Sequence, residues 1–376
     1  MKFGKLKPAP CGKTGFILLI LIMLISGCQK DKPPIKLGFA LNLTNSTTLS
    51  IGARNGVLMA VDDINAGGGI HGHKIELIMK DDRDAPATAV KVDRELIREH
   101  VAAIIGHIHS PTTIAAVPVM NKAKMVMISP IAATSRLSGI DDYYFRIDPP
   151  ALAKSILQAR YAYRLGLRKM TGIYDDKNKE YAETKYLEFK KTFEELGGRM
   201  LTPRTFSSGG NVSLPDLAAG MTEGNPDGYY IVANPRDSAM ICQHLRKLDP
   251  SRPIIATAWV YDREFIEQGG TAVEGVVFSH SFQQDSRDPA FMKFKNDFYR
   301  RYKIVPWMWE TDGYECVMAL AQALSQNPDP KQLKQTILKI GRFKGLQGDI
   351  VFDRYGDNQR KPLLFKVTHG AFVEIK

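Results

Sequence analysis

The sequence lacks any apolar run long enough to cross a membrane. The longest such run, Phe16 to Ile25, has ten residues in a chain of 376. Ten residues of helix rise about 15 Å, which is half of the ~30 Å hydrocarbon core of a bilayer. We therefore exclude a membrane-spanning helix and predict that this run is the apolar centre of a signal peptide.

Cysteine is scarce, with only 4 residues, so a fold built on disulfides is excluded. Cys11 falls within the predicted signal peptide and Cys28 directly follows it, which leaves Cys242 and Cys316 for the folded part. These two are far apart in sequence, and both lie within helical patterns. A disulfide between them stays open for an exported protein, but two buried thiols is the preferred interpretation.

Acidic residues are absent from the first 27 positions, where Lys2, Lys5, Lys7 and Lys13 account for four of the formal net charge of +11. The remaining chain carries 11 − 4 = +7 and has no basic run interleaved with aromatic residues. We interpret this surplus as a mildly basic, solvated surface and expect no nucleic acid partner.

The end of the apolar run suggests lipid attachment. Leu24-Ile25-Ser26-Gly27-Cys28 resembles the bacterial lipobox, which implies that Cys28 becomes an acylated first residue. Residues 1–27 are then a lipoprotein signal peptide and residues 28–34 a polar tether. The alternative is an ordinary signal peptide with an incidental cysteine. Either way we expect an exported protein, and the lipobox places it in the periplasm or at the cell surface.

Motifs of known enzymes and metal sites are missing or incomplete. There is no G-x-S-x-G or H-E-x-x-H string. Gly67 to Gly72 satisfies G-x-G-x-x-G, but it follows a helix and precedes a strand, the reverse of a dinucleotide site. The pairs His71/His73 and His107/His109 have metal-like spacing without further ligands nearby, so we expect structural or surface histidines. No metal, cofactor or enzymatic activity is predicted.

Strand-like and helical patterns alternate along the chain and predict an α/β fold. Helical spacing recurs from Ala53 to Ile64, from about Pro86 to Glu99 and from Pro111 to Ala123, each between short apolar runs. A second series begins after Pro150. Since 376 residues exceed one ordinary core, we predict two lobes, each with a mainly parallel sheet flanked by helices.

A candidate binding motif follows the strand that ends at Ile105. In Gly106-His107-Ile108-His109-Ser110-Pro111, Ser110 suits the N-cap and Pro111 the first position of a helix. Free N–H groups, a hydroxyl and the positive end of the helix together suit a carboxylate. The loop Ile128 to Ser135 is expected at the same edge of the sheet. The alternative is that Ser110 merely caps its helix.

Several motifs together resemble one family. The chain is similar to the branched-chain amino-acid-binding family of type I periplasmic binding proteins, which deliver solutes to ABC importers. The resemblance implies two lobes joined by three hinge crossovers, with lobe one at 35–149 plus 279–350 and lobe two at 150–278 plus 351–376. The motifs are Ile35 to Gly38, Asn55 to Asn65 continuing to Gly72, Asp81-Asp82, Ile105-Gly106 with Ser110, Ile128 to Pro130, and Ala272 to Val276.

The same resemblance implies a set of ligand-binding residues. Ser110 matches the serine that binds the ligand carboxylate, and Ala132 and Ala133 fall where backbone and a threonine complete that contact. Tyr181 matches a tyrosine of lobe two. The full set expected to bind ligand is Leu49, His109, Ser110, Ile131, Ala132, Ala133, Thr134, Tyr181, Asn234 and Trp259.

The sequence departs from the family pattern at three positions of this set. Leu49 and Asn234 stand where aromatic residues are usual. Near Ala258 and Trp259, amino-acid binders carry a glutamate for the ligand ammonium, and this chain has none there. Asp176 and Asp262 are the candidate replacement acids.

These expectations give a monomeric solute-binding protein that takes an amino acid or another small carboxylate and presents it to an ABC permease. Its only membrane attachment is the lipid on Cys28. Two alternatives remain open from sequence. The same lobes could present the ligand to a signalling receptor, or the chain could be an exported enzyme.

Overall fold

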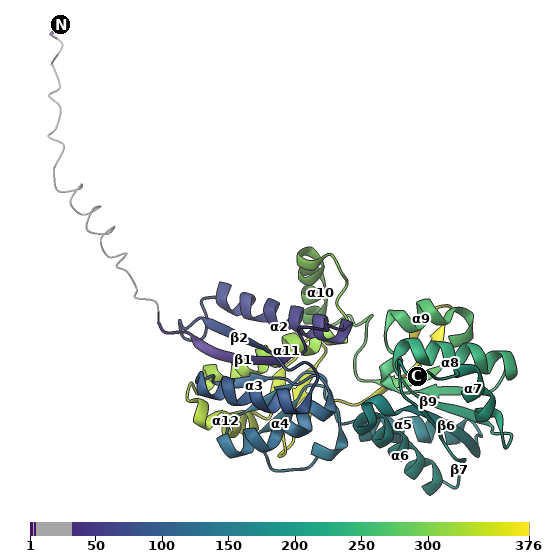
Figure 1. Ribbon diagram of the computed structural model, residues 1–376. Coiled ribbons are helices and arrows are strands. Elements are labelled where there is room, and N and C mark those ends of the chain that lie inside the picture. Colours follow the sequence, from purple (N-terminus) through teal and green to yellow (C-terminus); the bar gives the residue numbers. More distant parts are fainter. Residues whose placement is uncertain (3, 5–31, 376) are drawn as a thin grey trace.

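The computed structural model describes residues 1–2, 4 and 32–375. Most of the predicted signal peptide, Cys28 and most of the tether thus lie outside the described residues. Within them the chain forms two lobes, each an α/β sandwich (Figure 1). No helix among these residues has the length and apolar character needed to cross a bilayer.

The first lobe is built on a parallel sheet of five strands in the order β2-β1-β3-β4-β5. One face packs against α2 and α11, and the other against α3 and α4. A small hairpin, β12 and β13, and helix α12 complete the lobe. The bounds are β1 Ile35–Leu41, α2 Thr48–Ala66, β2 Ile75–Asp81, α3 Pro86–Arg98, β3 Ala103–Ile105, α4 Ser110–Ala123, β4 Met127–Ser129, β5 Tyr144–Arg146, α11 Met308–Gln326, α12 Leu333–Ile340, β12 Arg342–Lys344 and β13 Asp349–Val351.

The second lobe has a larger sheet in the order β15-β14-β11-β10-β9-β6-β7, with β8 also paired to β6. Strands β6 to β11 are parallel, whereas β14 and β15 are antiparallel to their neighbours. The bounds are α5 Ala151–Arg164, β6 Lys169–Asp175, α6 Lys179–Glu195, β7 Arg199–Met200, β8 Arg204–Phe206, α7 Leu214–Thr222, β9 Gly228–Val232, α8 Pro235–Leu248, β10 Ile254–Ala256, α9 Arg263–Gly269, β11 Val277–His280, β14 Leu363–Thr368 and β15 Ala371–Ile375.

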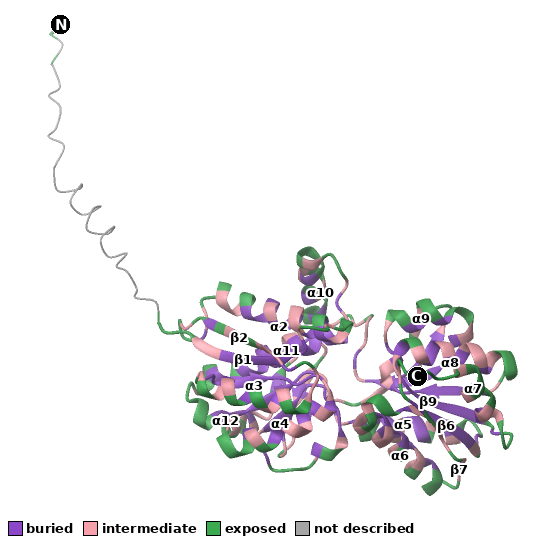
Figure 2. Cartoon of the chain, in the orientation of Figure 1, coloured by how far each residue is buried: buried purple, intermediate pink, exposed green. Residues whose placement is uncertain are grey.

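The sheets are buried on both faces, as the continuous apolar strands predict. All five residues of β9 are buried, and so are the last five of β1 (Figure 2). Helices α5 and α6 cover one face of the second sheet, and α7, α8 and α9 cover the other. The predicted α/β class is therefore confirmed.

Cys242 and Cys316 are buried free thiols, as preferred above.

The chain passes between the lobes three times: between β5 and α5, between β11 and α10 (Pro289–Tyr302), and between β13 and β14. Helix α10 packs on the first lobe, where the Tyr302 hydroxyl donates to the carbonyl of Asn55 at 3.2 Å. Strand pairing in the two sheets places two of the lobe boundaries differently from the expected ones. Ser279 and His280 belong to β11 in the second lobe, because β11 pairs with β10 and β14, and Val351 belongs to β13 in the first.

Buried polar contacts tie the first and third passages together. Arg146, at the end of β5, has no exposed surface and donates from Nε to Asp357 at 2.7 Å. The same guanidinium donates to the carbonyl of Thr134 at 2.7 Å and to the Ser138 hydroxyl at 2.9 Å. Nearby, Arg360 binds Glu315 of α11 through two contacts of 2.7 Å. These ion pairs fix the third passage against the first lobe.

Candidate functional site

A cavity of about 580 Å³, partly open to solvent, lies between the two lobes. Parallel strands of both sheets end at its walls, which is where open α/β sheets place ligands. The lining residues come from both lobes and from the passages between them. They are Leu49, Ile108, His109, Ser110, Ile131, Ala132, Ala133, Asp148, Lys154, Asn178, Tyr181, Lys185, Ala258, Trp259, His280 and Trp309.

Helix α4 presents its uncapped N-terminus at this cavity. The N-cap is His109 rather than the expected Ser110, and its side chain makes no capping hydrogen bond. The helix begins one residue early because its first backbone hydrogen bond runs from the N–H of Thr113 to the carbonyl of His109 at 3.1 Å. The hydroxyls of Thr112 and Thr113 donate to the same carbonyl at 2.8 Å. Ser110 is 3 % exposed and lines the cavity. Its side chain is therefore available to a ligand and does not cap its own helix.

The loop after β4 forms the adjoining wall. The Ser129 hydroxyl accepts from the N–H of Ala132 at 2.9 Å and donates to the carbonyl of His107 at 2.6 Å. These bonds hold Ile131, Ala132 and Ala133 at the cavity.

Thr134, expected beside them, does not reach the cavity. Its hydroxyl accepts from the N–H of Arg136, the second residue of the short helix Ser135–Leu137, at 3.3 Å, and its carbonyl accepts from Arg146 at 2.7 Å.

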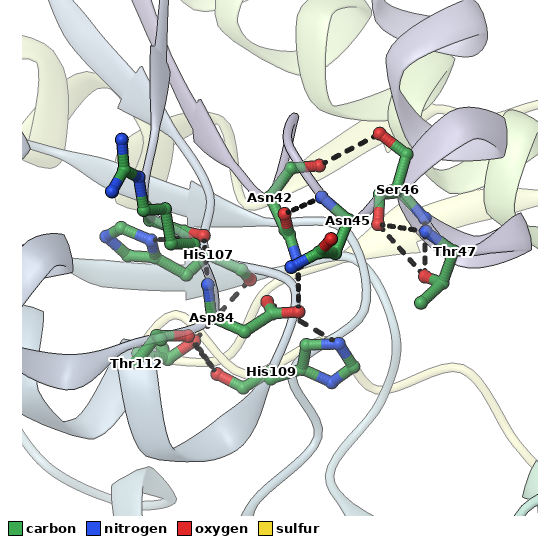
Figure 3. A network of polar contacts seen from close by, with 12 residues as sticks. Asn42, Asn45, Ser46, Thr47, Asp84, His107, His109 and Thr112 are labelled. Carbon is green, nitrogen blue, oxygen red and sulfur yellow. Dashed lines mark hydrogen bonds and ion pairs between the residues drawn. The ribbon is translucent and has the colours of Figure 1, made fainter.

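A polar network behind these loops holds His109 in place (Figure 3). The Asn42 amide, just beyond β1, donates to Asp84 at 2.7 Å, and Asp84 lies 3.7 Å from the His109 ring. Thr47 caps α2, so the first turn of α2 brings Leu49 to the cavity. The network thus joins the loops that follow β1, β2 and β3.

His107 is the buried anchor of the same wall. Its ring lies 2.6 Å from Asp82 and 3.2 Å from Asp93, with no exposed surface. Burial lowers the pKa of this imidazole, but the hydrogen bonds and charges of the two carboxylates outweigh burial and raise it to about 9. The described residues contain no group of three potential ligands placed to hold a metal ion. Both ring nitrogens of His107 contact buried carboxylates, so this residue holds the wall of the cavity together.

Two aromatic residues form the opposite wall. Tyr181 of α6 and Trp259 meet edge to face, with ring centroids 5.4 Å apart, and both line the cavity. Burial raises the pKa of the Tyr181 hydroxyl, which therefore stays neutral. Ala258 also lines this wall, with no acidic residue beside it in the lining.

Asn234, expected at this wall, lies elsewhere. It caps α8 by accepting from the N–H of Asp237 at 2.9 Å, and its amide nitrogen donates to Ser208 at 2.9 Å. This residue lines a separate surface pocket of lobe two. The replacement acids considered from sequence are also absent from the lining, and Asp262 caps α9 by accepting from Glu264 at 2.9 Å.

Sequence reasoning missed the charged residues of the cavity. Asp148 and Lys154 lie at the first passage and form a buried ion pair with each other. His280 lies beside them, and burial together with the neighbouring cations lowers its pKa well below the usual value, so its ring is neutral. Lys185 of α6 is 2 % exposed and brings a second ammonium. Of these residues, only Lys185 could have been noticed in the sequence. It falls between Ala182 and Tyr186 on the apolar face of its helix, where a charged side chain is unusual.

The fold is that of a two-lobed protein with a cavity between its lobes. Residues 34–369 match the profile of the family described as "Periplasmic binding protein", and the chain belongs to this family. It is a solute-binding protein and not an enzyme.

Relatives and solved structures agree with this assignment. The Leu/Ile/Val-binding protein homolog 1 of Brucella abortus is 25% identical over 336 residues, which are 85% of this chain and 86% of the relative. A leucine-binding protein from Thermotoga maritima shares the fold with a TM-score of 0.81 and 24% identity, over 91% of this chain and 98% of that one. A solute-binding protein of R. palustris, solved with benzoate, has a TM-score of 0.79 and 19% identity, over 91% and 95%.

Proposed function

We propose that this protein is the extracytoplasmic solute-binding component of an ABC importer and that its ligand is a small carboxylate without an α-ammonium group. The observation that carries this proposal is the uncapped start of α4 at the inter-lobe cavity, with the Ser110 hydroxyl beside it. Helix N-termini with free N–H groups bind carboxylates well. The family assignment supports the transport role.

The lining argues against a leucine-like ligand. Among the described residues, Asp148 is the one acid in the lining, and its carboxylate is already paired with Lys154. A buried ammonium that lacks its carboxylate loses roughly 3 to 5 kcal/mol. At ~1.4 kcal/mol per decade, this removes two or more decades of affinity. Trp259 and Tyr181 offer aromatic faces for an apolar or aromatic body.

Acylation of Cys28 would hold the protein at a membrane surface through the 28–34 tether, and a monomer would present its closed lobes to a permease. A ligand that contacts both lobes binds the closed arrangement of the lobes more tightly than the open one, so its binding favours closure.

Ser110→Ala tests the anion site. We expect the affinity for benzoate or 4-methylpentanoate to fall about 10-fold to 100-fold, because a hydrogen bond to a charged group is lost. The free energy of unfolding should change by less than about 0.5 kcal/mol, since the hydroxyl does not cap α4. Isothermal titration and urea unfolding measure the two effects, with Ser251→Ala in an exposed loop as the matched control. A large loss of stability with unchanged affinity would show that Ser110 is only structural.

A further inference from the structure

Lys185 is a buried cation on the cavity wall without a carboxylate partner. Its ammonium donates to the carbonyl of Ala151 at 2.6 Å and to the Ser155 hydroxyl at 3.3 Å. These two acceptors leave one of the three ammonium protons unused. Within residues 32–375, no carboxylate oxygen lies within the 4.0 Å of an ion pair from this nitrogen.

The acidic side chains near Lys185 form hydrogen bonds or ion pairs with other groups. Glu188, one turn along α6, accepts hydrogen bonds from Ser135 and from Ser155, the latter at 2.9 Å. Asp148 is paired with Lys154. Of the two lysines in the lining, Lys154 has an ion-pair partner and Lys185 has none among the described residues. An unpaired buried charge is costly, and a ligand anion would compensate for it.

Other groups of the lining also favour an acceptor-rich ligand. Trp309 of α11 is buried, and its indole N–H has no hydrogen-bond partner within the described chain. Tyr181 adds a neutral hydroxyl from the same helix as Lys185. Donors thus reach the cavity from both lobes, whereas the lining carboxylate, Asp148, is already occupied.

We propose that Lys185 binds a second carboxylate of the solute, so that the ligand class is a small dicarboxylic acid bridging Ser110 of lobe one and Lys185 of lobe two. This inference rests on the proposed function, because it assumes that one carboxylate lies at α4. Each carboxylate of such a ligand contacts a different lobe. The ligand can make both contacts only when the lobes are closed, so it binds the closed state more tightly than the open state.

Paired ligands and paired variants test the proposal by isothermal titration at pH 7. The diacids are glutarate, adipate and terephthalate, and the matched monoacids are pentanoate, hexanoate and benzoate. We expect at least one diacid to bind about 30-fold more tightly than its monoacid. Lys185→Gln should remove that preference and change monoacid affinity by less than about 3-fold. The control Lys191→Gln, on the exposed side of α6, should bind as the wild type does.

A pH profile separates ligand binding from a merely structural role. Burial lowers the pKa of Lys185 to about 8, so diacid affinity in the wild type should be nearly constant from about pH 6, where both ligand carboxylates are ionised, to pH 8 and fall above it. Glu188, Lys154, Asp148 and His280 face the same ammonium, and none is altered in the variant. Lys185→Gln should therefore lose this fall in diacid affinity above pH 8.

Three outcomes overturn the proposal: monoacids binding as tightly as diacids, an undiminished diacid preference in Lys185→Gln, or an unchanged pH profile in that variant. These outcomes leave the proposed function intact as long as the monoacids bind. If no carboxylate binds at all, the proposed function itself fails.

Discussion

Arg146→Met is expected to lower the free energy of unfolding by about 3 to 5 kcal/mol. The substitution removes a fully buried guanidinium and leaves Asp357 as a buried carboxylate without its partner. It also leaves the carbonyl of Thr134 and the hydroxyl of Ser138 without their donor. Because these contacts join the first and third passages between the lobes, solute affinity should fall as well. Urea unfolding and titration with benzoate measure the two losses.

The double variant Arg146→Met/Asp357→Leu is the control for this interpretation. It removes the stranded carboxylate, so it should recover part of the lost stability, since replacing a buried ion pair by apolar groups costs less than breaking it. The N–H of Gly139, which donates to Asp357 at 3.0 Å, limits the recovery. A double variant less stable than Arg146→Met would contradict the claim that Arg146→Met leaves Asp357 as a buried charge without a partner.

His107 should make the protein more stable at low than at high pH. The raised pKa of about 9 in the folded state, against 6.5 for the ordinary group, corresponds to about 3 kcal/mol of stabilisation. This contribution is fully present below pH 6.5 and declines as the pH rises, until it is lost above pH 9. Lys185 acts in the opposite direction above pH 8, because its pKa is lowered to about 8. The window from pH 6.5 to 8 therefore reports on His107.

The comparison with His107→Gln isolates this effect. The difference in unfolding free energy between the wild type and the variant should shrink by about 1.4 kcal/mol per pH unit within that window. A difference independent of pH would contradict a charged His107. If the variant does not fold, NMR titration of the wild-type imidazole supplies the same test, and a pKa near 6.5 would be the contrary result.

The regular elements were predictable from sequence wherever their apolar period is strong. Helix α2 contains the range Ala53 to Ile64 expected from helical spacing, and α3 and α4 match the other two expected ranges to within one residue at each end. The three-residue strand β5 was missed, because so short a segment has no visible period. The start of α4 was misplaced by one residue, because a serine before a proline is typical of an N-cap, whereas here the carbonyl of His109 already accepts the first backbone bond of the helix.

Only one wall of the candidate site could be predicted from the sequence. The wall made by Ser110 and Ala132 follows from two consecutive strand ends, which a parallel sheet must bring together. The charged residues of the lining do not, because Asp148 lies at the first passage and His280 ends β11, and the two meet only in the folded chain. Asn234 was assigned to the cavity by alignment of motifs, whereas its local role as a helix cap decides its orientation.

The central claim is that the cavity holds a carboxylate and has no site for an ammonium. The most direct test is a calorimetric comparison of leucine with 4-methylpentanoate, which differ only in the α-amino group. We predict that 4-methylpentanoate binds at least about 100-fold more tightly, because a buried ammonium finds no unpaired carboxylate in the lining. Equal or tighter binding of leucine would contradict the account.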